Sequence, residues 1–124
     1  MGELRSHRLS AVVSAPDEIL NASADSLLTL ARQAVADAEL TTISWAKADF
    51  EPQGASIILL LQESHVALHA WPEYGKLTVD IHVCDFNRDN LGRARQVAEA
   101  LSFVDRYPDN RGLWSVQTMR GDGP

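Results

Sequence analysis

The sequence predicts one domain of the α+β type within the α/β class, a two-layer sandwich in which two helices cover one face of an antiparallel sheet. The chain has 124 residues, of which 45% are hydrophobic, enough for one core but not for two domains. Two segments with helical periodicity flank four strand-like segments that are joined by links of hairpin length. Short links between consecutive strands favour antiparallel pairing, and two helices can cover only one face of such a sheet.

The first predicted element is a strand over residues 7–14, where apolar residues alternate loosely. A helix is predicted next over 24–39, because Asn21 and Ser23 can cap its start and apolar residues then recur at three- and four-residue steps. The apolar face of this helix comprises Leu27, Leu28, Ala31, Val35 and Ala38.

Four strands are predicted to follow, over 40–50, 56–62, 65–71 and 76–84. The unbroken apolar run at 57–61 indicates a buried strand. The next two strands alternate, so each should bury one face and leave polar side chains on the other. Those polar faces carry His65, Ala67 and His69 on one strand, and Thr78, Asp80, His82 and Cys84 on the next.

A second helix is predicted over 88–105 and a last strand over 113–119. The helix prediction rests on apolar residues at helical spacing, namely Leu91, Ala94, Val97, Ala98, Leu101 and Val104. Because both helices should lie on one side of the sheet, the other side needs a different cover. We expect dimerisation to provide it.

The charge balance disfavours several classes of partner. The net charge is −6, and the 11 Lys and Arg residues form no basic block, which argues against nucleic acid and anionic membranes. The longest apolar run, at 55–61, is far shorter than the roughly 20 residues that span a bilayer, and the polar start leads into no apolar signal core. We therefore expect a cytoplasmic protein. The single cysteine, Cys84, excludes an intrachain disulfide and a Cys-based zinc cluster.

The segment 62–84 holds most of the reactive side chains and reads QESHVALHAWPEYGKLTVDIHVC. An acid, a hydroxyl and an imidazole stand together at 63–65, but not in the G-x-S-x-G pattern of a serine hydrolase. His65 and His69 lack a third metal ligand at a recognisable spacing, so no metal site is predicted. Cys84 and His69 could form a thiol nucleophile and its base. Taken alone, these residues leave the reaction open.

The whole segment resembles the bacterial and archaeal short form of S-adenosylmethionine decarboxylase. The signature of that family is approximately E-S-H-[LIV]-[ST]-I-H-T-W-P-E-Y-[GK], followed by a strand that ends V-D-[LIV]-F-T-C-G. The likeness runs without a gap over 63–84. Upstream, Phe50, Pro52, Gly54 and Ser56 fall where the family has F-x-P-x-G-x-S. The order of elements and the length agree as well, so the likeness covers nearly the whole chain.

The resemblance implies that the chain is a proenzyme that cuts itself between Glu63 and Ser64. The single domain, 1–124, would then consist of a β chain, 1–63, and an α chain, 64–124. Ser64 would become a covalent pyruvoyl group, which takes the amino group of the substrate as a Schiff base and accepts the electrons released with CO₂.

Other roles are also implied by the resemblance. His69 matches the base of processing and Ser56 its helper. Cys84 matches the proton donor to the α-carbon, and a thiol with a pKa of about 8.5 is mostly protonated at neutral pH. Phe50 matches an aromatic residue that stacks on adenine, and Glu73 the carboxylate that holds the ribose hydroxyls. The implied reaction is decarboxylation of S-adenosylmethionine to the aminopropyl donor of spermidine synthesis, by a homodimer of αβ protomers.

Two departures from the signature leave alternatives open. His82 replaces an aromatic residue, and Asp85 replaces the glycine after the proton donor. An added carboxylate would favour a guanidinium or an ammonium group, so arginine or ornithine is the alternative substrate. A non-catalytic binding or regulatory relative is the alternative class. We expect Trp71 and Tyr74 to be packing residues rather than ligands.

Overall fold

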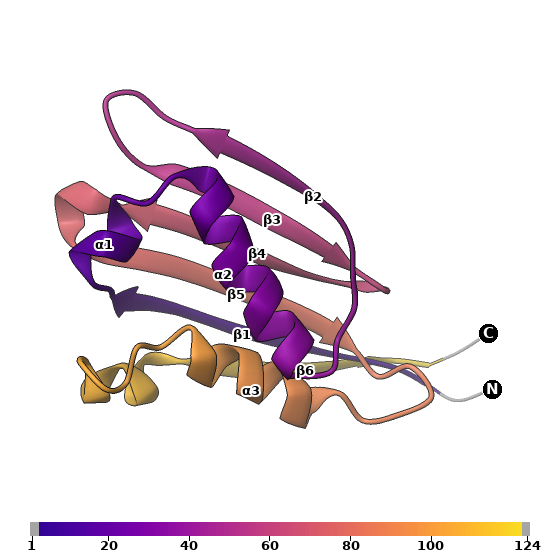
Figure 1. Ribbon diagram of the computed structural model, residues 1–124. Coiled ribbons are helices and arrows are strands. Elements are labelled where there is room, and N and C mark those ends of the chain that lie inside the picture. The colour runs from indigo at the N-terminus through magenta and orange to yellow at the C-terminus, as the bar shows by residue number, and fades with distance from the viewer. Residues whose placement is uncertain (1–2, 123–124) are drawn as a thin grey trace.

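The computed structural model describes residues 3–122, and its six strands form one sheet in the order β2-β3-β4-β5-β1-β6 (Figure 1). All neighbouring strands pair antiparallel, as predicted. The strands are β1 (Leu4–Ser14), β2 (Thr42–Asp49), β3 (Ala55–Leu61), β4 (Ser64–Trp71), β5 (Lys76–Cys84) and β6 (Ser115–Gly121).

The helices lie on one face of the sheet (Figure 1), which confirms the predicted two-layer α+β sandwich. The helical elements are α1 (Asp17–Leu20), α2 (Ala24–Asp37), α3 (Leu91–Ala100) and two 3₁₀ turns, η1 (Pro72–Tyr74) and η2 (Pro108–Leu113). Ser23 caps α2 as expected, with its side chain accepting from the Ser26 N–H. The short α1 and the 3₁₀ turns were not predicted, because they contain too few residues to show a periodicity.

The predicted helix 88–105 is shorter in the structure. Helix α3 begins only at Leu91, because side chains of the preceding loop bind the main chain of residues 84–90. Its apolar face is nevertheless the predicted one, and Ala94, Val97 and Leu101 are fully buried.

The core lies between the helices and the covered face of the sheet. Every second residue of the central strands points into it. Each fully buried large aliphatic side chain stabilises the fold by about 1.5–3 kcal/mol. These residues are Leu9 and Val13 of β1, Ile57, Leu59 and Leu61 of β3, Val66 and Leu68 of β4, and Leu77, Val79, Ile81 and Val83 of β5.

Strand β3 corrects the prediction of a buried strand at 56–62. Ile57 is 2% exposed, but its neighbour Ile58 is 41% exposed and Leu60 is 52% exposed. The reason is that the helices cover only one face, so alternate apolar residues of β3 lie on the other. We call this helix-free side the open face; it carries Ile58 and Leu60 beside Ala67, His65, His69, Asp80, His82, Arg8 and Val12.

Candidate active site

The predicted cleavage bond lies at the tight turn between β3 and β4. Glu63 adopts φ 57°, a left-handed conformation that costs an L-residue with a side chain roughly 1–2 kcal/mol. Ser64 follows as the first residue of β4 and is 8% exposed, with its side chain on the helix side of the sheet. A strained residue therefore directly precedes a buried serine.

The main chain of Cys84 lies beside Ser64 at the end of the adjacent strand β5, whereas its side chain alternates with that of buried Val83 and so lies on the open face. The Cys84 N–H donates a hydrogen bond to Ser64 Oγ at 3.2 Å. Burial raises the pKa of the Cys84 thiol, and the carboxylates of Glu63 and Asp85 raise it further. The thiol is therefore held in its protonated form at neutral pH, as an acid requires.

A cavity of about 210 Å³ opens next to Ser64. Its lining mixes apolar and polar side chains from the turn after β3, the loop after β5 and the segment before β2. They are Leu40, Thr41, Leu61, Gln62, Phe86, Arg88 and Asn90, together with Ser64 itself. This is enough space beside the serine for a small amino-acid-sized group.

Ser56 and His69 form a second pair, on the open face. They lie directly opposite each other on β3 and β4, and Ser56 Oγ is 2.7 Å from His69 Nδ1. An apolar hollow of about 320 Å³ adjoins them, lined mainly by Ala46, Ala48, Ile58 and Ala67. The hydroxyl and the imidazole are therefore hydrogen-bonded to each other beside an apolar surface.

Phe50 and Glu73 lie near this second pair, at the end of the sheet where β2 turns into β3 and β4 runs into η1. Gln53, in the loop after Phe50, donates to the Glu73 carboxylate at 3.2 Å, which joins the two segments. Phe50 is 52% exposed, so its ring is free to stack on a ligand. Trp71 is 43% exposed and Tyr74 is 71% exposed, so neither is a buried packing residue as predicted.

The two groups of side chains do not meet within one chain. His69 is five residues along β4 from Ser64, which is roughly 16 Å at about 3.3 Å per residue. The two side chains also point to opposite faces, because five is an odd number of strand positions. The predicted base therefore cannot reach the Glu63 carbonyl of its own chain.

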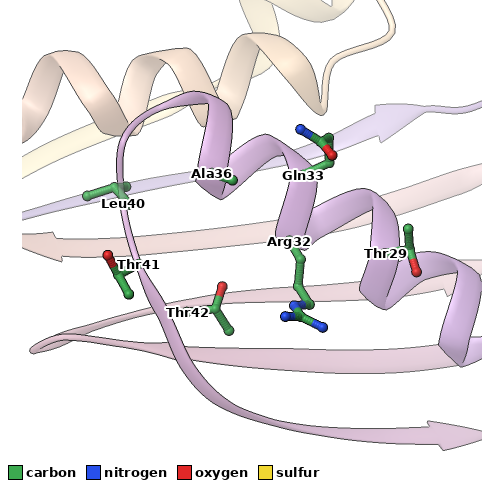
Figure 2. Close-up of a pocket in the computed structure, with 7 residues that line it drawn as sticks. All are labelled: Thr29, Arg32, Gln33, Ala36, Leu40, Thr41 and Thr42. Atoms are coloured by element: carbon green, nitrogen blue, oxygen red, sulfur yellow. The ribbon is translucent and has the colours of Figure 1, made fainter.

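Another hollow lies on the covered side of the sheet, between α2 and the segment that leads into β2 (Figure 2). It has a volume of about 470 Å³, and the guanidinium of Arg32, one of its lining residues, stacks 4.4 Å from the Trp45 ring centroid. None of the site residues predicted from the sequence lines it.

The S-adenosylmethionine decarboxylase family model matches residues 7–105. The chain belongs to this family. Similar proteins named S-adenosylmethionine decarboxylase proenzyme include that of Thermoplasma volcanium, 33% identical over 86% of this chain and 76% of the relative. Another is that of Pseudomonas aeruginosa, 40% identical over 81% of this chain and 65% of the relative.

The proenzyme of Picrophilus torridus is 42% identical over 63% of this chain, and the matched part spans only 59% of that relative. A solved structure, the adenosylmethionine decarboxylase of Aquifex aeolicus, matches all of this chain and 95% of its own with a TM-score of 0.72 and 23% identity. That likeness supports the S-adenosylmethionine decarboxylase fold. Among residues 3–122, no helix is long and apolar enough to cross a membrane.

One feature of this S-adenosylmethionine decarboxylase family member was missed in the sequence. His65 and His82 face each other across β4 and β5, with ring centroids 5.2 Å apart in an edge-on arrangement. Burial lowers the pKa of His82, and His65 and Arg8 lower it further, so His82 is neutral at physiological pH. Knowing the strand register would have revealed the pair, but the sequence alone does not provide it.

Proposed function

We propose that this protein is a pyruvoyl-dependent S-adenosylmethionine decarboxylase that activates itself by cutting between Glu63 and Ser64. The observation that carries the proposal is the juxtaposition of left-handed Glu63, buried Ser64 and protonated Cys84 in a member of this family. The product would be the aminopropyl donor of spermidine synthesis, and the location cytoplasmic. Residues 1–63 and 64–124 would remain together as one cut domain.

In the first step, Ser64 Oγ attacks the carbonyl carbon of Glu63 and converts the peptide bond into an ester. The ester is less stable than the amide, so the site must supply the difference. The left-handed Glu63 contributes roughly 1–2 kcal/mol if cleavage relieves its strain. Loss of the Ser64 α-proton then expels the Glu63 carboxylate, and water hydrolyses the remaining dehydroalanine to the pyruvoyl group with release of ammonia.

A homodimer is part of the proposal, because the base and the bond that it serves are too far apart in one chain. A second copy placed against the open face could bring its own Glu63–Ser64 bond to the Ser56–His69 pair of the first. A two-fold axis would then build two complete sites from two identical chains. The exposed Ile58 and Leu60 support this surface as the interface, because association would bury them.

The pyruvoyl group supplies an electron sink for the charge left by departing CO₂. Position 64 fits such a group, since it is buried, adjoins the cavity of about 210 Å³ and touches the main chain of Cys84. Cys84 does not line that cavity, but its main chain borders Ser64, and its protonated thiol would supply the proton to the substrate α-carbon. Phe50 would stack on the adenine, and the Glu73 carboxylate would accept hydrogen bonds from the ribose hydroxyls.

The structure removes the reason for considering arginine and ornithine as alternative substrates. They were considered because Asp85 adds a carboxylate next to Cys84. However, that carboxylate already accepts hydrogen bonds from His7 and from the Asn90 N–H, and it does not line the cavity beside Ser64. A non-catalytic relative is also disfavoured, because the chain retains the reactive residues Ser64, His69 and Cys84.

Denaturing mass spectrometry of the purified protein tests the proposal. Two fragments are expected, 1–63 and 64–124, the second with a blocked N-terminus, whereas Ser64→Ala should stay intact. A release assay for CO₂ should then respond to S-adenosylmethionine and not to arginine or ornithine. A wild-type chain that stays uncut and inactive after long incubation would instead indicate a binding module.

A further inference from the structure

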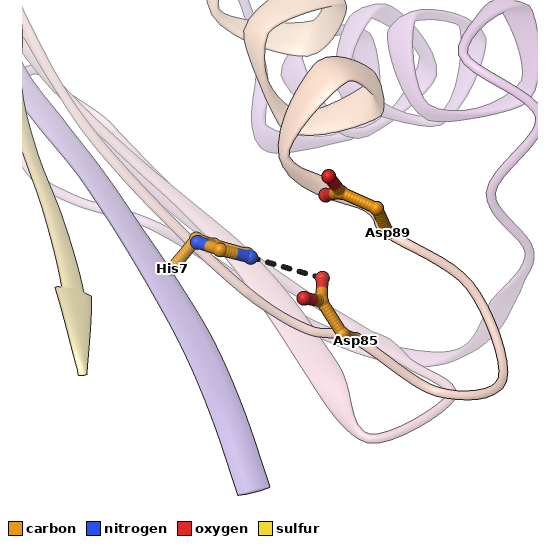
Figure 3. Close-up of side chains that lie close together, drawn as sticks. All are labelled: His7, Asp85 and Asp89. Atoms are coloured by element: carbon orange, nitrogen blue, oxygen red, sulfur yellow. Dashed lines mark hydrogen bonds and ion pairs between the residues drawn. The ribbon is translucent and has the colours of Figure 1, made fainter. Parts of the chain in front are cut away.

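Asp85 stands directly after Cys84, but its side chain points toward β1 and the start of α3 (Figure 3). Its Oδ1 accepts two hydrogen bonds, one from His7 Nε2 at 2.9 Å and one from the Asn90 N–H at 2.9 Å. The guanidinium of Arg5 lies 3.8 Å from the other oxygen. His7 is 3% exposed, so this carboxylate is the partner of a buried imidazole.

The same contacts continue to the main chain of Cys84. Asn90, whose N–H binds Asp85, donates from its side-chain Nδ2 to the Cys84 carbonyl at 2.9 Å. The Cys84 N–H in turn donates to Ser64 Oγ. Asp85 and Ser64 are therefore linked by one uninterrupted chain of hydrogen bonds through Asn90 and the main chain of Cys84.

We infer that Asp85 is a positioning residue for the chemistry of Ser64 and Cys84. It holds the loop 85–90 so that the main chain of Cys84 stays against Ser64 Oγ, and it places a fixed negative charge beside the thiol. This inference rests on the proposed function. It gives a role to the residue that stands where the family signature has glycine.

The electrostatics agree with that role. Burial by itself opposes ionisation of Asp85, but the hydrogen bonds from Asn90 and His7 and the charge of Arg5 outweigh it, so its pKa lies below the ordinary value. Asp85 is thus a carboxylate at neutral pH. Besides Asp85, the charge of Glu63 on the turn acts on the thiol. His82 lies two residues before Cys84 on the same strand, and Arg5 on β1 lies against Asp85.

A metal site is the competing interpretation of this cluster. Within residues 3–122, His7, Asp85 and Asp89 bring one ligand atom each within 4.8 Å of one another. However, Asp85 Oδ1 already has two donors, and Asp89 Oδ1 accepts from the Leu91 N–H at 2.9 Å. A cation would have to displace these bonds next to the positive charge of Arg5. The existing hydrogen bonds therefore favour positioning.

Alkylation of Cys84 by iodoacetamide tests the effect of the charge, in a Ser64→Ala background where no cleavage can occur. Asp85→Asn should speed alkylation at neutral pH about three- to tenfold, because removing a like charge a few ångströms away favours the thiolate. Asp89→Ala is the matched control. This variant also loses a hydrogen bond at the start of α3, but the Asp89 side chain bonds Leu91 rather than Asn90 or Cys84, so its alkylation rate should equal that of the parent.

The rate of self-cleavage tests the positioning, in chains that keep Ser64. Asp85→Ala removes the acceptor and should slow cleavage about tenfold or more, whereas Asp85→Asn keeps an acceptor oxygen and should stay within about threefold of wild type. Asp89→Ala should again match wild type. Unchanged alkylation in Asp85→Asn, or wild-type cleavage in Asp85→Ala, overturns the inference. If the wild-type chain itself stays uncut, the proposed function fails, and alkylation alone then decides whether Asp85 acts on the thiol.

Discussion

Chains that carry His69→Ala should be cut when they are paired with chains that carry Ser64→Ala. Each variant alone should stay intact, because the first lacks the base and the second lacks the nucleophile. The expectation follows from the separation of roughly 16 Å between positions 64 and 69 on one strand, and from their opposite faces. A hydrogen-bonding base must come within about 3 Å of its proton, so a base at position 69 would have to act on a second copy.

The magnitude follows from the symmetry of the pair. If the two variants are co-refolded in equal amounts and associate at random, about half of the dimers are mixed, and each mixed dimer holds one intact site. About half of the His69→Ala chains should therefore be cut before subunits exchange. With a ninefold excess of Ser64→Ala chains the fraction should rise to about nine-tenths.

Denaturing mass spectrometry measures the outcome, since the masses of 1–63 and 64–124 differ from those of both intact variants. In the matched control, the Ser64→Ala chain is replaced by the double variant Ser64→Ala/His69→Ala, which can pair but brings no base. If mixtures with the Ser64→Ala chain are cut no more than this control, His69 does not act across the interface, and the proposal of a site shared between two chains is wrong.

Four further predictions concern the same site. Cys84→Ala should still cut itself but lose most decarboxylation, which a cleavage gel and a CO₂ assay would separate. Glu73→Ala should lower kcat/KM for S-adenosylmethionine roughly 30- to 1,000-fold, through the loss of two hydrogen bonds. Phe50→Ala should lower it less, because the loss of a stacked ring costs about 1–3 kcal/mol. Self-cleavage should be unchanged in both variants. Glu63→Gly should slow cleavage roughly 5- to 30-fold, because glycine adopts φ 57° without strain, whereas Glu63→Ala keeps the strain and should cut faster than Glu63→Gly. Because the pKa of Asp85 is lowered on folding, its carboxylate stabilises the fold above about pH 4, and this contribution is lost as the pH falls through the folded-state pKa. Urea unfolding should therefore show Asp85→Asn to be less stable than wild type at neutral pH, with a difference that shrinks as the pH is lowered below about 4; a difference independent of pH would contradict it.

The order of elements and the faces of the strands could be predicted from the sequence because both are local properties. A period of two assigned Val66 and Leu68 to the core and His65 and His69 to the other face, as the structure has them. The period could not show that Leu60 is exposed, because a continuous apolar run has no polar face to mark the open side. Exposure there depends on how many helices cover the sheet.

The site could be predicted only in part, since its decisive contacts are not local. Ser56 and His69 were both assigned to processing through the family resemblance, and the structure adds that they touch. The partner of Asp85 could not be predicted from the sequence, because His7 lies 78 residues away in the chain and no spacing pattern indicates a hydrogen bond between such distant residues. The sequence therefore suggested a free carboxylate for the substrate, where the fold has a bonded one.

The separation of the two groups of side chains has a consequence for how activation is controlled. The turn with Glu63 and the pair of Ser56 and His69 lie toward opposite ends of the β3–β4 hairpin. In a two-fold pair, the arrangement that brings one base to the partner's bond also brings the partner's base to the first. One association event would thus complete both sites at once. A single chain that has just folded would keep its strained bond without a base, and cleavage would begin only after the open faces have met.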